Sequence, residues 1–264
     1  MFIRKSFVAI ILMLVFSSCT ENLLDGVESD NDVLPDPVVE FEWIIPEAVK
    51  YSVILNCYRD FIFLGDQSEE DYDFDEAKSL MNKVADEVKI NDVYSNDQKS
   101  WELLCSFTPH ATNLGYALHD INDDGIPELI IFSDNYNGFI HAIYTLHNDV
   151  PVFIGGFWER HSCTFDENGT LYIHGSSGAL DSSSGSYFLP EVGTELQLIE
   201  MYVTNGYDEN NSNPRCYMIK DGEKTMVDYK EAMASMDQFP HTFRDGATIN
   251  VELVHIPFNS TFAE

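Results

Sequence analysis

Apolar residues between positions 46 and 107 recur with helical spacing. In segment 46–64, Val49, Val53, Cys57 and Phe61 are four residues apart, with Ile54 and Tyr58 beside them. Such a stripe is typical of an amphipathic helix with one buried face. A second stripe predicts a helix in 75–89, and 100–107 is expected to form a short helical turn.

After Gly115 the hydrophobic period shortens towards two residues, as expected for strands. Asn168–Gly169, Asp221–Gly222 and Asp245–Gly246 tolerate the positive φ angles of tight turns, so they predict hairpins. The glycine- and serine-rich segment 175–186 is expected to be a long loop. The predicted strands are 115–121, 128–132, 139–147, 152–158, 170–175, 186–189, 195–203, 216–220 and 248–256.

These patterns predict an α+β fold with N-terminal helices packed on an antiparallel β-sheet of hairpin-connected strands. Residues 41–110 are expected to be helical, and residues 111–264 to form an antiparallel β region with one inserted helix near 228–237. We expect 41–264 to fold as one unit. Residues 20–40 are acidic, contain two prolines and lack a regular period, which predicts a flexible tether.

The first 19 residues have the pattern of a lipoprotein signal peptide. Arg4 and Lys5 precede an apolar run that is too short to span a membrane, and small residues follow before Cys19. The ending FSSC is similar to a bacterial lipobox, in which cleavage precedes the cysteine and the new N-terminal residue carries lipid. Phe16 stands where leucine is usual, which leaves cleavage by an ordinary signal peptidase open. The resemblance implies lipidation of Cys19 and a membrane-anchored location at the bacterial cell surface.

The chain is strongly acidic, with a formal net charge of −31. Removal of residues 1–18 would make it more negative, because this segment contains two cations and no acids. Such a charge repels phosphate backbones and anionic headgroups, so we expect neither nucleic-acid binding nor electrostatic membrane docking. It favours divalent cations, although solubility alone accounts for most of the acids. Apart from Cys19, the cysteines show no CxxC spacing, which argues against a zinc site.

One segment, 120–128 (DINDDGIPE), concentrates oxygen-bearing side chains around a glycine. With Asp120 as position one, Asn122 is third, Asp124 fifth, Ile126 seventh and Glu128 ninth. A calcium loop uses side chains at alternate positions, a glycine at the sixth for the turn, and a backbone carbonyl at the seventh. An acidic turn that binds no metal is the alternative.

This segment resembles the calcium loops of dockerins and of the FG-GAP and VCBS repeats of integrin-type propellers. More broadly, segments 51–62, 116–132 and 217–233 resemble a group of uncharacterised secreted bacterial lipoproteins. The resemblance implies calcium as the ion and Asp120, Asn122, Asp124, Ile126 and Glu128 as its ligands. Position twelve is Ile131 rather than the glutamate of an EF-hand, and the single copy excludes a full propeller.

We therefore expect a non-catalytic, lipid-anchored extracellular protein with one structural calcium site and an unknown ligand, either a polysaccharide or another protein. The alternative is an extracellular hydrolase acting on cell-wall or dietary polymer. His161 and Cys163 would lie on one strand face, but no third catalytic group accompanies them, so the sequence leans against an enzyme. Four aromatic residues could stack on sugars, although a place in the sheet core is the simpler interpretation: Trp101, Trp158, Tyr172 and Tyr187.

Overall fold

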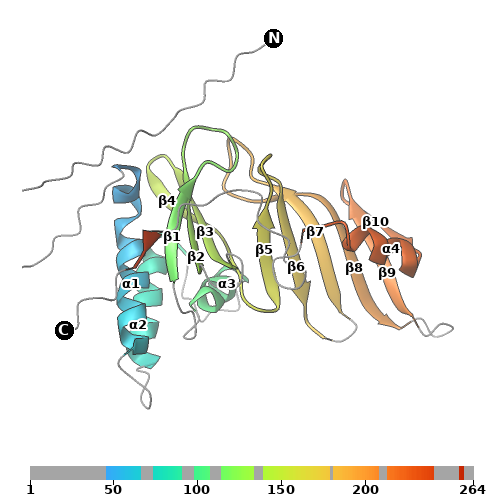
Figure 1. Cartoon of the computed structure of the whole chain (residues 1–264), viewed down its shortest axis with the longest axis horizontal. Coiled ribbons are helices and arrows are strands. Elements are labelled where there is room, and N and C mark those ends of the chain that lie inside the picture. The colour runs from blue at the N-terminus through green and yellow to red at the C-terminus, as the bar shows by residue number, and fades with distance from the viewer. Residues whose placement is uncertain are drawn as a thin grey trace, which may run out of the picture. The chain divides into compact units, whose positions relative to one another are not determined.

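The computed structural model describes residues 46–66, 74–90, 98–107, 114–133, 139–178, 181–207, 213–240 and 256–258. All of them belong to one compact unit, Glu42–Glu264. The signal peptide with Cys19, the tether and most of the predicted strand 248–256 lie outside the described residues. Figure 1 shows the order of helices and strands along the chain.

Three helices precede the first described strand, as the hydrophobic stripes predict. The chain enters α1 through a short 3-10 helix, η1. Ile54, Cys57, Tyr58 and Phe61 of the predicted stripe are buried, whereas Val49 and Val53 are 53% and 39% exposed. Tyr58 joins the helices to the sheet: its hydroxyl lies 2.9 Å from Ser106 Oγ and 3.0 Å from the Tyr144 hydroxyl. The elements are η1 (Pro46–Tyr51), α1 (Ser52–Asp66), α2 (Phe74–Glu87) and α3 (Gln98–Ser106).

The first sheet has the strand order β11-β1-β2-β3-β4, and its neighbouring strands are antiparallel. Alternate residues of β2 point to opposite faces. Leu129 and Ile131 pack against the helices, whereas Ile130 and Phe132 pack in a second core with residues of the other sheet. Burial on both faces explains why β2 is apolar without alternation. The strands are β1 (Leu114–His119), β2 (Glu128–Ser133), β3 (Phe139–His147), β4 (Val150–Gly156) and β11 (Ile256–Pro257).

The second sheet has the order β10-β9-β8-β7-β6-β5 and is also antiparallel. Its strands β5 and β6 contribute Cys163, Phe165 and Leu171 to the second core. On the opposite face, Ala232 and Met236 of α4 pack on Tyr202 and Cys216. The elements are β5 (His161–Phe165), β6 (Leu171–Ser176), β7 (Ser182–Phe188), β8 (Gln197–Tyr207), β9 (Pro214–Lys220), β10 (Glu223–Val227) and α4 (Tyr229–Met236).

The α+β class and the antiparallel strands are confirmed, but the strands form two sheets and the helices are not all N-terminal. The division falls between β4 and β5: the backbone of Trp158 bonds to that of His161, and β5 pairs with β6 in the second sheet. The inserted helix is confirmed as α4, whose first turn is capped by Asp228. Gly169, Asp221 and Gly222 have the positive φ angles expected of the predicted turns.

The prediction of a loop throughout 175–186 is wrong, because Ser182–Phe188 forms strand β7. Short hydroxyl side chains suit this strand: Ser182 Oγ lies 2.8 Å from Thr204 Oγ1 of β8, and Ser184 Oγ lies 2.9 Å from His174 Nδ1 of β6. Strands β5 and β10 also lie outside the predicted segments.

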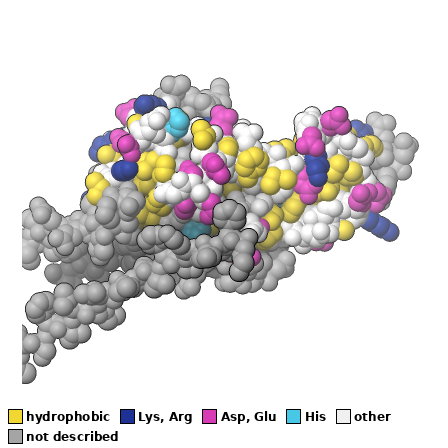
Figure 2. All heavy atoms as spheres, turned by 90° about the horizontal axis from the view of Figure 1, so that it is seen from above, with side chains coloured by type: hydrophobic (Ala, Val, Ile, Leu, Met, Phe, Trp, Pro, Cys, Tyr) yellow, Lys and Arg dark blue, Asp and Glu magenta, His cyan; other side chains and the backbone are white. Residues whose placement is uncertain are grey.

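One face of the described surface shows how the acidic residues are distributed. On the face shown in Figure 2, Asp and Glu side chains are spread among hydrophobic and uncharged ones. Within the described ranges, the structure contains no helix long and apolar enough to cross a membrane.

Candidate metal centre

Segment 120–128 connects two antiparallel strands of the first sheet. His119 at the end of β1 pairs with Glu128 at the start of β2, so residues 120–127 form the intervening loop. The chain can turn within this loop because Asp123 and Gly125 adopt positive φ angles of 59° and 85°. Aspartate and glycine are among the residues that tolerate this conformation best. The loop is flanked by two strands, whereas the loop of an EF-hand is flanked by two helices.

The side-chain oxygens of the loop face its own backbone. Asp120 accepts hydrogen bonds from the N–H groups of Asp124 (3.1 Å) and Gly125 (2.8 Å). Asn122 Oδ1 accepts from the same Asp124 N–H at 3.2 Å, and Asp124 Oδ1 accepts from the N–H of Ile126 at 2.7 Å. Because a carboxylate offers about four lone-pair sites, these bonds orient the oxygens and leave acceptor capacity for a cation.

Glu128 has a different environment from the other acidic residues of the segment. Its side chain is fully buried, and it accepts hydrogen bonds from the Ile121 N–H and the Thr145 hydroxyl, both at 2.8 Å. Burial, opposed by these two bonds and reinforced by Asp124 and Asp120, raises the pKa of Glu128 to about 7. Glu128 therefore anchors the loop to β3 and carries a proton more readily than an ordinary glutamate does.

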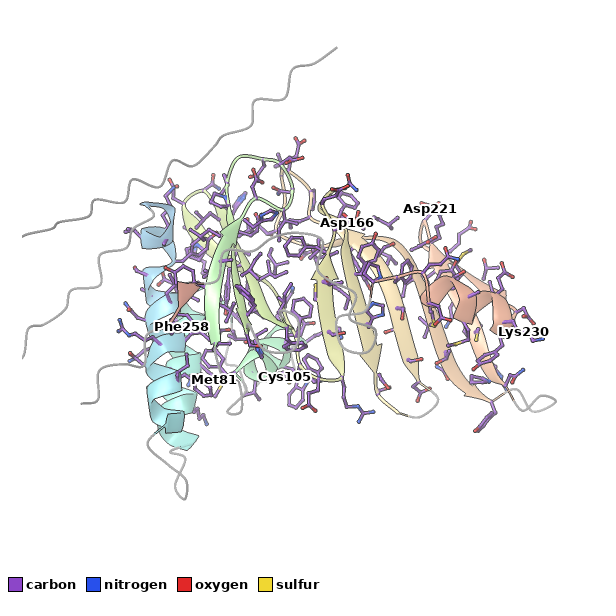
Figure 3. The ribbon with its side chains drawn as sticks, in the orientation of Figure 1. Met81, Cys105, Asp166, Asp221, Lys230 and Phe258 are labelled. Carbon is purple, nitrogen blue, oxygen red and sulfur yellow. The ribbon has the colours of Figure 1, made fainter. Side chains whose placement is uncertain are left out.

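The loop also touches three other parts of the fold. The Tyr51 hydroxyl of η1 donates a hydrogen bond to the Pro127 carbonyl at 3.1 Å, and Asn122 Nδ2 donates to the Pro190 carbonyl at 3.2 Å. The Ile121 carbonyl lies 1.9 Å from the place where a Cβ on Gly169 would be. Only glycine permits this approach of the β5–β6 turn, where Asp166 is labelled in Figure 3. The loop thus connects the helical layer with both sheets.

The donor set fits a hard cation in part. Asp120, Asn122, Asp124 and the carbonyl of Ile126 would supply carboxylate, amide and backbone oxygens, which calcium prefers. Within the described ranges, no three or more His, Cys, Asp or Glu side chains are grouped so that they could hold a metal ion. Glu128 is better suited to a supporting role than to direct ligation, because its side chain is fully buried and its raised pKa favours the protonated carboxyl.

The contacts that position the loop were not identified from the sequence. Tyr51 was expected only as part of a helix, Gly169 only as a turn residue, and Pro190 had no assigned role. All three are distant from Asp120 in sequence, so local spacing carries no sign of them. The motif itself was the one available signal.

His161 and Cys163 do not form a nucleophilic pair. The Cys163 side chain is fully buried, and burial raises the pKa of its thiol far above the usual range, so the thiol stays protonated. His161 packs instead against the rings of Phe157 and Trp158. Among the described residues, Cys57, Cys105, Cys163 and Cys216 are all free thiols.

Comparison with known proteins gives no relative from which a role could be transferred. No protein-family model matches the chain, and no curated protein and no solved structure gives a significant match.

Proposed function

We propose that this protein is a non-catalytic, lipid-anchored protein of the bacterial cell surface whose folded unit is stabilised by one calcium ion in loop 120–128. The ion would be held by Asp120, Asn122, Asp124 and the carbonyl of Ile126. Glu128 would support the loop from the buried side. The folded unit would present a binding surface to an external polysaccharide or protein.

The observation that carries the calcium proposal is the inward orientation of the loop oxygens. Asp120 and Asn122 both direct an oxygen at the Asp124 N–H, so the two side chains are already held on the inner side of the turn. A cation there would also offset the repulsion between the Asp120 and Asp124 carboxylates. Ordering this loop would strengthen its contacts with η1 and with the second sheet.

The expected stabilisation can be bounded. Calcium sites of extracellular modules have dissociation constants of about 0.1 to 1 mM. Binding to the folded state alone would then add about 0.4 to 2 kcal/mol to the free energy of unfolding at one to a few millimolar calcium. The lack of a carboxylate at position twelve favours the lower half of this interval.

Two neighbouring substitutions of the same kind test the assignment. Asp124→Asn weakens a proposed ligand yet keeps an acceptor for the Ile126 N–H. Asp123→Asn removes the same charge from an exposed side chain at the adjacent position, and asparagine tolerates the positive φ angle found there. We expect wild type and Asp123→Asn to melt at a higher temperature when calcium is added after chelation. Asp124→Asn should lose most of that response.

Thermal melts and calorimetry of calcium binding decide the matter. If calcium raises the melting temperatures of Asp123→Asn and Asp124→Asn equally, the net negative charge of the loop, rather than ligation by Asp124, produces the stabilisation. No response in wild type, together with no heat of binding at millimolar calcium, would reduce the segment to an acidic turn. Magnesium should substitute poorly, because it requires compact octahedral coordination.

The surface location is supported by the sequence of residues 1–19. Cys19 would carry the lipid, and the acidic tether 20–40 would hold the folded unit away from the bilayer. A flexible coil of this length spans on the order of 25 Å, and repulsion between its acids would extend it further. The folded unit would then be free to meet large ligands outside the cell.

A further inference from the structure

A cavity of about 490 Å³ lies at the end of the second sheet that is remote from loop 120–128. It is formed where β5 and β7 begin and β6 ends, together with the later part of β8. The loop contacts the opposite end of β5, through the turn that carries Gly169. The cavity is therefore separate from the candidate metal centre, and its volume falls within the usual interval for small-molecule sites.

The floor of this cavity is one row of residues across four strands. His161 of β5 pairs with Gly175 of β6, Gly175 with Ser183 of β7, and Ser183 with Val203 of β8. Residues directly opposite each other in neighbouring strands share a face of the sheet. Along this row, which runs perpendicular to the strands, the polar residues His161 and Ser183 alternate with the apolar residues Gly175 and Val203.

Gly175 creates the depth of the cavity. A Cβ placed on Gly175 would lie 3.0 Å from Ser183 Oγ and 3.3 Å from His161 Nδ1. Two polar atoms thus face the same small space above a residue that has no side chain. A ligand hydroxyl placed there could bond to both, since a serine hydroxyl and a neutral imidazole can each donate or accept.

Trp158 supplies an aromatic wall. Its ring centroid lies 4.6 Å from that of His161, and Phe157 stacks on His161 from a distance of 5.7 Å. The backbone bonds between Trp158 and His161 hold the turn that carries the indole. Burial lowers the pKa of His161, so the imidazole is neutral at physiological pH. The backbone bonds and the contact with His161 together hold the Trp158 ring in position before a ligand arrives.

The polar groups of the cavity include several that are not committed to the fold. Among the described residues, the Ser183 hydroxyl, the His161 ring nitrogens and the Arg160 guanidinium have no hydrogen-bond or ion-pair partner. The Asp181 carboxylate accepts a 3.3 Å bond from the Gly206 N–H. The cavity therefore contains one charge of each sign together with neutral donors and acceptors.

We infer that this cavity binds a neutral saccharide unit, with one sugar face against Trp158 and hydroxyls directed at His161 Nδ1 and Ser183 Oγ. The inference names a ligand class for the binding surface in the proposed function, and rests on that proposal for the external source of the sugar. A pyranose presents C–H groups on one face and hydroxyls at its edge, which matches an indole beside a hydroxyl-rich floor.

Other ligand classes fit less well. An anion would meet Arg160 but also Asp181, on a chain whose formal net charge is −31. A peptide seated on this floor would lie across the face of four paired strands and would not add a strand to the sheet.

Titration calorimetry of the full chain in a non-glycosidic detergent tests the inference. The probes are maltotetraose, cellotetraose, mannotetraose and chitotetraose, with tetragalacturonate and inorganic phosphate as anionic comparisons. We expect at least one neutral oligosaccharide to bind with a dissociation constant on the order of millimolar, as suits an open site with few anchoring groups. Trp158→Ala should weaken that binding about tenfold or more, by removal of the aromatic wall.

Two variants address the floor, and one serves as a control. Gly175→Val would fill the space between His161 and Ser183 and should abolish binding. Ser183→Ala removes one hydroxyl with little risk to folding and should weaken binding severalfold. Trp101→Ala removes a tryptophan that is 55% exposed on α3, outside the cavity, and should leave binding unchanged.

The inference is overturned if no neutral probe binds at 10 mM, if only the anionic probes bind, or if Trp158→Ala and Ser183→Ala bind as wild type does. A saccharide that binds to a chain without a calcium response would uphold this inference and refute the calcium proposal. A chain that responds to calcium and binds no saccharide would do the reverse.

Discussion

Replacement of Glu128 by glutamine should stabilise the protein at neutral and alkaline pH when calcium is absent. Glutamine has nearly the same shape and can keep both hydrogen bonds of the buried carboxylate. Its oxygen would accept from the Ile121 N–H, and its amide would donate to the Thr145 hydroxyl, which can rotate to accept. The variant therefore removes a buried charge without leaving a buried polar group unsatisfied.

The magnitude follows from the pKa of Glu128, which rises from 4.5 in the unfolded chain to about 7 in the fold. The folded state therefore holds the proton more tightly than the unfolded state. Stability from this group is fully present below pH 4.5 and is lost as the pH rises through 7. At about 1.4 kcal/mol for each pH unit, the loss in wild type approaches about 3 kcal/mol above pH 7. The glutamine variant should not show this loss.

Urea unfolding in the presence of a chelator, at intervals from pH 4.5 to 8, measures the effect. The free energies of unfolding of wild type and Glu128→Gln should be similar at pH 4.5 and diverge in favour of the variant towards pH 8. Glu102→Gln is the control, because Glu102 accepts a 2.8 Å bond from Gln98 and lies 3.9 Å from Lys99. Because Glu102→Gln weakens these contacts, its free energy of unfolding at pH 8 should not exceed that of wild type.

Two outcomes would refute this reasoning. If Glu128→Gln is less stable than wild type at pH 8 without calcium, the buried carboxylate contributes favourably and its proposed pKa is wrong. If the difference between the two proteins is the same at every pH, proton binding by Glu128 is not its cause. The variant should also retain its calcium response, and loss of that response would restore Glu128 as a direct ligand.

Three further predictions concern the anchor, the tether and the loop contact. Cys19→Ser should release the protein from the membrane or leave it unprocessed, as detergent-phase partitioning would show, and a mature variant that stays bound would refute lipidation. A chain that begins near Glu40 should melt within a degree or two of the full mature chain at matched calcium, and a larger loss would mean that residues 20–40 pack on the folded unit. Gly169→Ala should cost about 1 to 3 kcal/mol of unfolding free energy in urea titrations, because Gly169 has a φ of +76° and its Cβ would collide with the Ile121 carbonyl. An unchanged midpoint would refute the contact.

The local elements of this fold could be predicted because they depend on local spacing. The stripe through Cys57 and Phe61 marks the buried face of α1, and the dipeptide Asn168–Gly169 marks a hairpin turn. The position of loop 120–128 between two strands was predicted correctly from its glycine and from the apolar run that follows it. Each of these signals arises from residues within one turn of helix or a few positions of strand.

The division into two sheets could not be predicted in the same way. A period of two residues identifies a strand but does not specify its partner, so the predicted strands 152–158 and 170–175 were expected in one sheet, whereas β4 and β6 belong to different sheets. The first part of β7 was missed because Ser182 and Ser184 resemble loop residues until their partners in β6 and β8 are known. The partners of the loop, Tyr51 and Pro190, are brought to it by tertiary structure alone.

Strand β10 has a consequence for crowding at a surface. Among the described strands it pairs with β9 alone, so its outer edge offers backbone groups to which a second molecule could add a strand. Anchoring to a membrane would raise the local concentration and with it the hazard of such aggregation. The edge is short, it carries Glu223 and Lys224, and it belongs to a chain with a large negative charge. These properties oppose edge-to-edge association, so we expect dense populations of this protein to remain dispersed.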